Sequence, residues 1–259
     1  MNDRRPIIIA VSGLSSNTGK TTLVCELLER LSIGTHASGM LHASGVRTGW
    51  EAIKLTRGHY RSCGKDPNGC CVSELLRDEP LIRSGRAGNY ETGKDTGRFW
   101  DAGAVNVHWV IVGEDQVEAG INEALSRVQS AGVIVEGNSF LDYVQADYAI
   151  MCARAGQNKL KTSSKRILAK ADAIYLSTID DSDRETAIRN FDGWRVGLST
   201  ELNTEGLETY TREDLPRLIE TIQSLHQDPT RIEPSEEPSK MAADSSPGRK
   251  PGDRQPLFP

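Results

Sequence analysis

A run of small polar residues with two glycines and one lysine, near the start of the chain, has the composition of a phosphate-binding loop. It reads SGLSSNTGKTT from Ser12 to Thr22. Backbone N–H groups in such a loop, and at the start of the helix after it, point at phosphate oxygens, and the helix dipole adds positive potential. Lys20 would meet the β- and γ-phosphates, and Thr21 would offer its hydroxyl to Mg²⁺. The predicted nucleotide contacts are therefore Gly13, Ser15, Ser16, Asn17, Thr18, Gly19, Lys20, Thr21 and Thr22.

The residues on either side of this segment predict the strand and the helix that position it. Ile7–Val11 is an unbroken apolar run, typical of a strand buried on both faces. From Leu23 to Leu31 the apolar residues recur at helical spacing. An ordinary turn rich in glycine and serine is the alternative, but the sequence GKTT between a strand and a helix favours phosphate binding.

A second strand ends in a carboxylate of the kind that accompanies a phosphate loop. Gly132–Glu136 reads GVIVE, four small or apolar residues followed by an acid. This is the pattern of a Walker B strand, whose acid holds Mg²⁺ directly or through water. Glu136 is therefore predicted to lie near the metal. The alternative is a buried strand that ends in an acidic residue without a metal.

Several strings resemble known families of P-loop NTPases. Five residues separate Gly13 from Gly19, one more than in the standard motif, and this longer loop resembles that of dethiobiotin synthetase. The string VEG at Glu136 is similar to the corresponding strand in that family and in the molybdopterin-guanine dinucleotide biosynthesis protein B family. The string GKDTGRFWDAGA, from Gly93, resembles the Gly-Lys-Asp-Ser-x-Arg-x-x-x-Ala-Gly-Ala segment of the protein B family.

These resemblances imply roles for further charged residues. In dethiobiotin synthetase the acid of the VEG strand is a metal ligand, and the lysine that follows the second strand, matched here by Lys54, serves the substrate. The protein B resemblance implies that Lys94, Asp95 and Arg98 are active-site or metal-shell residues. The catalytic set is thus Lys20, Lys54 and Asp95, and the Mg²⁺ set is Thr21, Glu136 and Asp95. A solvated Lys54, and a solvent-exposed helix start capped by Asp95 or Thr96, are the alternatives.

Two further groups of residues have weaker patterns. Cys63, Cys70 and Cys71 could bind a second metal ion, but their spacing matches no established site, and free thiols in a loop are the alternative. Asp180, in the string STID, could accept hydrogen bonds from the two donors of a guanine base. The lysine that usually precedes such an aspartate is missing, so an ordinary polar loop is the alternative. Cys25 and Cys152 are predicted core residues.

The whole pattern predicts an α/β fold of the P-loop NTPase type, a three-layer αβα sandwich around a mostly parallel sheet. Seven strands are expected, at residues 7–11, 50–56, 105–112, 132–136, 148–153, 173–176 and 194–198. Helices are expected at 23–31, 114–129, 163–170, 182–190 and 212–226, with Thr211 as the cap of the last. One domain spans residues 1–227 with an irregular insertion at 56–100, and the Pro- and Ser-rich residues 228–259 are expected to be a disordered tail.

Composition excludes several partners and locations. The formal charge of −5 over 259 residues gives no basic surface for nucleic acid, and no apolar run reaches the length of a membrane span. The chain enters its first strand without room for a signal peptide, and its cysteine count is odd, so a cytoplasmic protein without disulfides is expected.

The function predicted from the sequence is Mg²⁺-dependent nucleotide binding with NTP hydrolysis or phosphoryl transfer. GTP is favoured over ATP, and the protein B resemblance implies a cofactor-biosynthesis adapter with a partner enzyme. An ATP-dependent synthetase or kinase that acts on a small molecule is the first alternative, as the synthetase resemblance implies. A thiol- or metal-responsive nucleotide switch is the second alternative, and a homodimeric assembly stays open.

Overall fold

The computed structural model describes residues 5–33, 47–58, 75–154, 162–177, 184–198 and 207–225. Cys63, Cys70, Cys71, Asp180 and residues 228–259 lie outside this part of the chain, so the expectations for them stay predictions.

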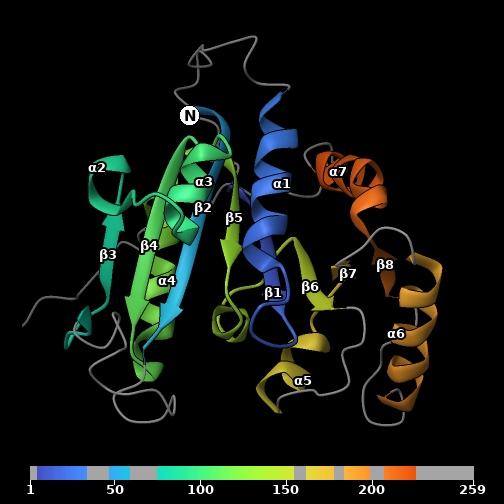
Figure 1. Cartoon of the computed structure of the whole chain (residues 1–259). Coiled ribbons are helices and arrows are strands. Elements are labelled where there is room, and N and C mark those ends of the chain that lie inside the picture. The colour runs from blue at the N-terminus through green and yellow to red at the C-terminus, as the bar shows by residue number, and fades with distance from the viewer. Residues whose placement is uncertain are drawn as a thin grey trace, which may run out of the picture.

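A single sheet with the strand order β3-β4-β2-β5-β1-β6-β7-β8 forms the middle layer. All neighbouring strands pair in parallel except β3, which runs antiparallel to β4 at one edge (Figure 1). The strands are β1 (Ile7–Gly13), β2 (Arg47–Arg57), β3 (Leu81–Ser84), β4 (Asn106–Val112), β5 (Ser130–Glu136), β6 (Tyr148–Arg154), β7 (Ala173–Ser177) and β8 (Glu208–Tyr210).

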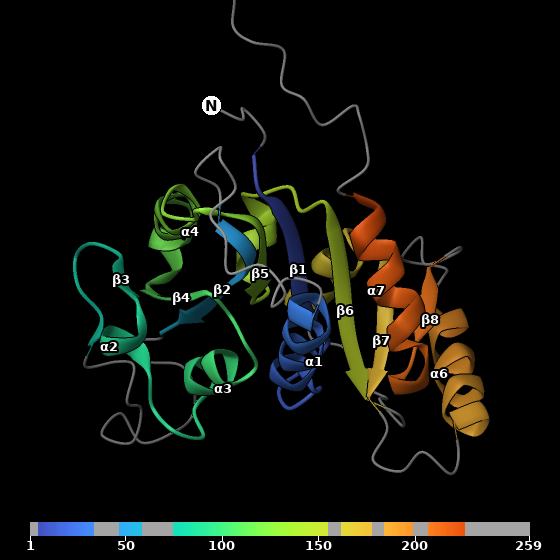
Figure 2. The same ribbon diagram turned by 90° about the horizontal axis from the view of Figure 1, so that it is seen from above.

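Helices cover both faces of this sheet, and α4 lies on the opposite side from α1 and α3 (Figure 2). The helices are α1 (Lys20–Ile33), α2 (Arg86–Asn89), α3 (Asp95–Asp101), α4 (Val117–Ser126), α5 (Thr162–Leu168), α6 (Arg184–Leu198) and α7 (Leu215–Ser224), with 3₁₀ turns η3 (Glu114–Gln116), η4 (Ser139–Asp142) and η6 (Arg212–Asp214). The predicted αβα sandwich is confirmed. Among the described residues, no helix is both long and apolar enough to cross a membrane.

The alternation of side chains along the strands divides the core into two layers. In β1, Ile7, Ile9 and Val11 pack with α1, α3 and α7, whereas Ile8 and Ala10 pack with α4, η4, α5 and α6. All residues of β1 are buried, as expected for a central parallel strand with helices on both faces. The loop after β1 therefore starts from a fully buried strand in the middle of the sheet.

Six of the seven predicted strands are present, and one prediction is wrong. Residues 194–198 continue α6, because a five-residue apolar run does not distinguish a strand from part of a helix. The sheet has eight strands and not seven, because it also contains two edge strands, β3 and β8, that the sequence pattern did not predict. They have four and three residues, too few to show a period of two.

The ends of several helices differ from the sequence prediction. Lys94, and not Asp95 or Thr96, is the N-cap of α3. Asp95 instead pairs with Lys54, and the Thr96 hydroxyl donates to the carbonyl of Asn89 at 2.6 Å, so neither side chain caps the helix. The helix expected from Glu114 begins with η3 and becomes α-helical at Val117. Thr211 is the N-cap of the turn η6, where its hydroxyl and backbone N–H both donate to Asp214, whereas the N-cap of α7 itself is Asp214.

Candidate functional site

The segment from Leu14 to Gly19 connects β1 to α1 at the carboxyl edge of the sheet, where parallel α/β sheets bind ligands (Figure 1). Leu14, which occupies the place of a glycine in the standard motif, is fully buried. Its N–H donates to the carbonyl of Cys152 at 3.0 Å, and its carbonyl accepts from Ser164 at 2.9 Å. Leu14 thus attaches the loop to β6 and α5.

Two residues near the tip of the loop have left-handed backbone conformations. Asn17 has φ 58° and Gly19 has φ 82°, and Asn17 is the one non-glycine residue with positive φ in the described part of the chain. Asparagine and glycine tolerate this region best. Such conformations direct successive backbone N–H groups to one side and make a concave anion site. The Ser177 hydroxyl, from the end of β7, donates to the carbonyl of Thr18 at 3.2 Å and supports this turn.

The side chain of Lys20 folds back over the start of the loop. A Cβ atom on Gly13 would lie 3.1 Å from the Lys20 ammonium nitrogen and 2.4 Å from the Thr18 hydroxyl oxygen. Gly13 is therefore required by close approach, and Lys20 is held against the backbone of the loop. This is the position from which an ammonium group meets phosphates bound in the loop.

Asn138, directly after β5, fixes the backbone of Gly13 on both sides. Its side-chain oxygen accepts from the Gly13 N–H at 3.0 Å, and its amide nitrogen donates to the Gly13 carbonyl at 2.8 Å. The Ser12 hydroxyl adds a bond to the carbonyl of Gly137 at 2.9 Å. The first residues of the loop are thus tied to the end of the strand that carries Glu136.

The residues predicted for the metal and for catalysis meet beside the loop. Glu136 and Lys54 are direct partners in the β2–β5 pairing, and their side chains form an ion pair of 2.6 Å. Lys54 also pairs with Asp95 at 2.6 Å. The Thr21 hydroxyl donates to the other oxygen of Glu136 at 3.1 Å. Two carboxylates, one ammonium group and one hydroxyl from four separate elements therefore converge at this point.

Charge in this cluster is stabilised by its partners. Burial by itself would raise the pKa of Asp95, but the Lys54 ammonium, with the Thr21 hydroxyl and Arg98, holds the pKa of that carboxyl below its ordinary value. Burial likewise opposes a charged Lys54, but Glu136 and Asp95 raise the pKa of Lys54 above its ordinary value. Lys54 and Asp95 are therefore both charged at neutral pH.

The oxygen ligands of this cluster fit a Mg²⁺ ion. Mg²⁺ prefers oxygen, and P-loop proteins hold it through the loop hydroxyl and one or two carboxylates together with phosphate oxygens. Thr21, Glu136 and Asp95 are the residues that would hold it. Within the described residues, no three His, Cys, Asp or Glu side chains form a metal group by themselves, so phosphate oxygens would have to complete the site.

The other predicted residues are placed as follows. Arg98 donates to the Thr22 hydroxyl at 3.3 Å and so borders the start of α1, whereas Lys94 is exposed. Cys25 and Cys152 are buried free thiols, as predicted, and burial raises the pKa of Cys25 to about 11. Ser15, Ser16, Asn17 and Thr18 form the loop itself.

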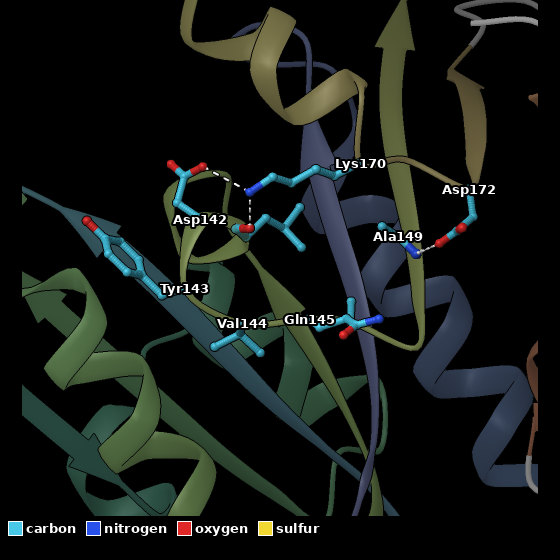
Figure 3. Close-up of a pocket in the computed structure, with 9 residues that line it drawn as sticks. Asp142, Tyr143, Val144, Gln145, Ala149, Lys170 and Asp172 are labelled. Atoms are coloured by element: carbon cyan, nitrogen blue, oxygen red, sulfur yellow. Dashed lines mark hydrogen bonds and ion pairs between the residues drawn. The ribbon is translucent and has the colours of Figure 1, made fainter. Parts of the chain in front are cut away.

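A cavity lies away from this loop. It has a volume of about 450 Å³ and is bounded by residues 141–146, Ala149, Lys170 and Asp172 (Figure 3). The Lys170 ammonium is bonded to the carbonyl of Leu141 and to Asp142, and Asp172 accepts from the Ala149 N–H. These charged groups are bonded to protein atoms, and none of them belongs to the loop.

Comparisons with known proteins add little to this geometry. No protein-family model matches the sequence, and no curated protein matches it. Hydrogenase maturation factor HypB from Archaeoglobus fulgidus is similar in structure, with 9% identity, 85% of this chain and 90% of that chain covered, and a TM-score of 0.47. The resemblances to dethiobiotin synthetase and the protein B family find no support in these comparisons.

Together, the arrangement of the strands and the loop identify the fold as that of a P-loop NTPase. A central parallel strand, a glycine-bounded loop and a helix that starts at Gly-Lys-Thr are present, with a buried acid on the neighbouring strand. Sequence reasoning missed the supporting residues Asn138, Ser164 and Ser177. The first and last follow or end parallel strands, which is a signal that could have identified them.

Proposed function

We propose that this protein binds a nucleoside triphosphate in the loop from Gly13 to Thr22 and hydrolyses it, or transfers its terminal phosphoryl group, with Mg²⁺. The observation that carries the proposal is the convergence of Thr21, Lys54, Asp95 and Glu136 beside that loop. A phosphate loop alone binds anions, whereas two charged carboxylates next to it make a place for a divalent cation.

The residues of the chain supply positioning and charge neutralisation. Lys20 and the loop N–H groups bind the phosphates and stabilise negative charge as it moves toward the leaving oxygen. Bound Mg²⁺ would supply further neutralisation of the phosphate oxygens. Lys54 orients Glu136 and Asp95 through its two ion pairs, and Asn138 holds Gly13 so that the loop does not have to reorganise when phosphate binds.

The finer assignments are part of this proposal. We infer GTP as the nucleotide, with Asp180 as the acceptor for the guanine donors, and an adapter role in cofactor biosynthesis. The alternative is an ATP-dependent synthetase or kinase for a small metabolite, in which Lys54 serves that substrate. Slow turnover without an added metabolite supports the adapter, and strong stimulation by one metabolite supports the synthetase or kinase.

The proposal is tested by thermal-shift titration with GTP and ATP, with and without Mg²⁺, on the full chain and on Lys20→Ala. A ligand that binds only the folded protein raises its apparent stability, so a nucleotide should raise the melting temperature of the wild type and not that of the variant. Lys170→Ala is the matched control, since Lys170 lies at the separate cavity. A shift for Lys20→Ala equal to that of the wild type would refute the loop assignment, and equal shifts for GTP and ATP would refute the preference for guanine.

A further inference from the structure

A second group of interacting polar side chains lies at the opposite edge of the sheet from the phosphate loop. Ser84 ends β3, next to α2 (Figure 1), and His108 and Glu51 lie near the starts of β4 and β2. Ser84 and His108 are direct partners in the antiparallel β3–β4 pairing. The Ser84 oxygen lies 2.8 Å from Nδ1 of His108, and Nε2 of His108 lies 2.8 Å from the Glu51 carboxylate.

The surroundings of Glu51 determine which nitrogen of His108 carries the proton. Glu51 accepts from the backbone N–H groups of Gln129 and Ser130 at 2.7 and 2.9 Å, so its carboxylate is held as an acceptor. A carboxylate cannot donate, so Nε2 of His108 must donate to it. The Asn106 amide, 3.2 Å from Nε2, is a longer contact and also donates to Glu51. In neutral His108, Nδ1 is therefore the acceptor, and the Ser84 hydroxyl must donate to it.

In this group the base and its partner are buried and the serine is exposed, as a nucleophilic site requires. The side chains of His108 and Glu51 are 1% and 0% exposed, whereas Ser84 is an exposed residue on the edge strand of the sheet. The Arg127 guanidinium donates to the Ser84 oxygen at 3.4 Å. A reagent can thus reach the serine oxygen, whose proton faces a buried base and whose developing negative charge faces a cation.

We propose that Ser84, His108 and Glu51 form a serine-nucleophile site that accepts the acyl group of an activated carboxylic ester. Ser84 is the nucleophile, His108 is the general base, and Glu51 is a positioning residue that fixes the tautomer and orientation of His108. This site is separate from the phosphate loop, and no described cavity near it selects a large acyl group.

The reaction needs only the ester and water. The Ser84 oxygen attacks the ester carbonyl carbon as its proton moves to Nδ1 of His108. The carbon–oxygen bond to the leaving alcohol then breaks, and His108 returns the proton to that oxygen. The product is an ester on Ser84, which water hydrolyses by the same two proton transfers in a second cycle. The Arg127 guanidinium, which donates to the Ser84 oxygen, stabilises negative charge that develops next to that oxygen.

The test uses the full chain without nucleotide, so that its outcome is independent of the phosphate loop. p-Nitrophenyl acetate and a fluorophosphonate reagent are the probes, with p-nitrophenol release and peptide mass mapping as readouts. We expect a burst of p-nitrophenol and a covalent adduct on Ser84. Ser84→Ala should lose both, and His108→Gln should react at least roughly 100-fold more slowly, since general base catalysis contributes on the order of 10²–10⁴-fold.

Ser126→Ala is the matched control, because Ser126 is an exposed serine whose hydroxyl donates to a backbone carbonyl and to no histidine. It should keep the full burst and the adduct. Melting curves identify any variant that fails to fold, and Ser84→Ala alone decides the case if His108→Gln unfolds. An unmodified wild-type Ser84, or an equal burst in Ser84→Ala, would overturn the proposal.

Discussion

Glu136 lies at the end of a central strand and contacts residues of both the predicted phosphate site and the predicted metal site. Its side chain is 1% exposed, and its two oxygens contact Thr21 and Lys54. A buried carboxylate is costly unless charged or polar groups compensate it. Here one compensating group comes from the phosphate loop and the other from the neighbouring strand. A substitution of this residue should therefore weaken binding of the cation more than binding of the nucleotide.

We predict that Glu136→Gln raises the Mg²⁺ concentration needed for half-maximal NTP hydrolysis by roughly 10- to 100-fold, the usual loss of metal affinity when a residue that supports a metal site is changed. The amide keeps the shape and one acceptor but removes the charge. Nucleotide binding should change much less, because the loop N–H groups and Lys20 remain. A Mg²⁺ titration of turnover in wild type and variant measures the effect.

Glu114→Gln is the matched control for this prediction. Glu114 is a surface carboxylate, 81% exposed, that pairs with Arg57. Its loss should leave the Mg²⁺ titration unchanged. If Glu136→Gln also left it unchanged, the metal would have to be held elsewhere, and Asp95 would be the first residue to examine.

At the scale of elements, the sequence predicted the central strands and the helices after them, because these have long apolar runs or clear periodicity. The prediction from the sequence was wrong at the two edges of the sheet and within α6. β3 and β8 are short, and the alternation of Trp194, Val196 and Leu198 imitates a strand within a helix. The convergence of Lys54 with Glu136 could not be predicted either, since it depends on β2 pairing with β5 and not with β1.

The link between β5 and the phosphate loop leads to a prediction about Asn138. Asn138→Ala removes both hydrogen bonds to Gly13, so the loop loses its fixed starting point. We expect a loss of about 1–3 kcal/mol in the free energy of unfolding, the usual cost of unpaired buried polar groups, together with weaker nucleotide binding. Urea denaturation and nucleotide titration measure the two effects.

Ser139→Ala, a change at the next residue of η4, is the control, because it leaves the Asn138 side chain in place. It should match the wild type in both measurements. Unchanged nucleotide affinity in a destabilised Asn138→Ala would mean that the hydrogen bonds to Gly13 serve the fold and not the site.

At the scale of the whole molecule, two groups of paired charged side chains lie at opposite edges of the part of the sheet formed by β4, β2 and β5. Lys54, Asp95 and Glu136 lie at the carboxyl edge, and Glu51 lies with His108 at the other. The sequence showed the first group through its motifs. It gave no sign of the second, because Glu51 and His108 belong to no motif and meet only through strand pairing. Stability should therefore depend on pH through both groups.

The direction of that dependence follows from the pKa shifts. Burial by itself would raise the pKa of Glu51, but the bond from His108 and the N–H groups of Gln129 and Ser130 lower it below 4.5, its ordinary value. The pKa of Asp95 is also lowered, from 3.8, and that of Lys54 is raised, from 10.5. A carboxyl group whose pKa is lowered in the folded protein stabilises the fold at pH values above its pKa in the unfolded chain, and this stabilisation is lost as the pH falls. An ammonium group whose pKa is raised in the folded protein stabilises the fold at pH values below its pKa in the unfolded chain, and this stabilisation is lost as the pH rises.

We therefore predict that the urea midpoint is constant across neutral pH, decreases as the pH falls below 4.5, and decreases again as it rises above 10.5. Asp95→Asn is the diagnostic variant, because it removes one depressed carboxyl and one partner of Lys54. Both the acid and the alkaline decreases should be smaller in this variant than in the wild type. Urea denaturation across a pH series measures both limbs. An alkaline limb identical in wild type and Asp95→Asn would show that the Lys54–Asp95 pair contributes nothing to the stability of the fold.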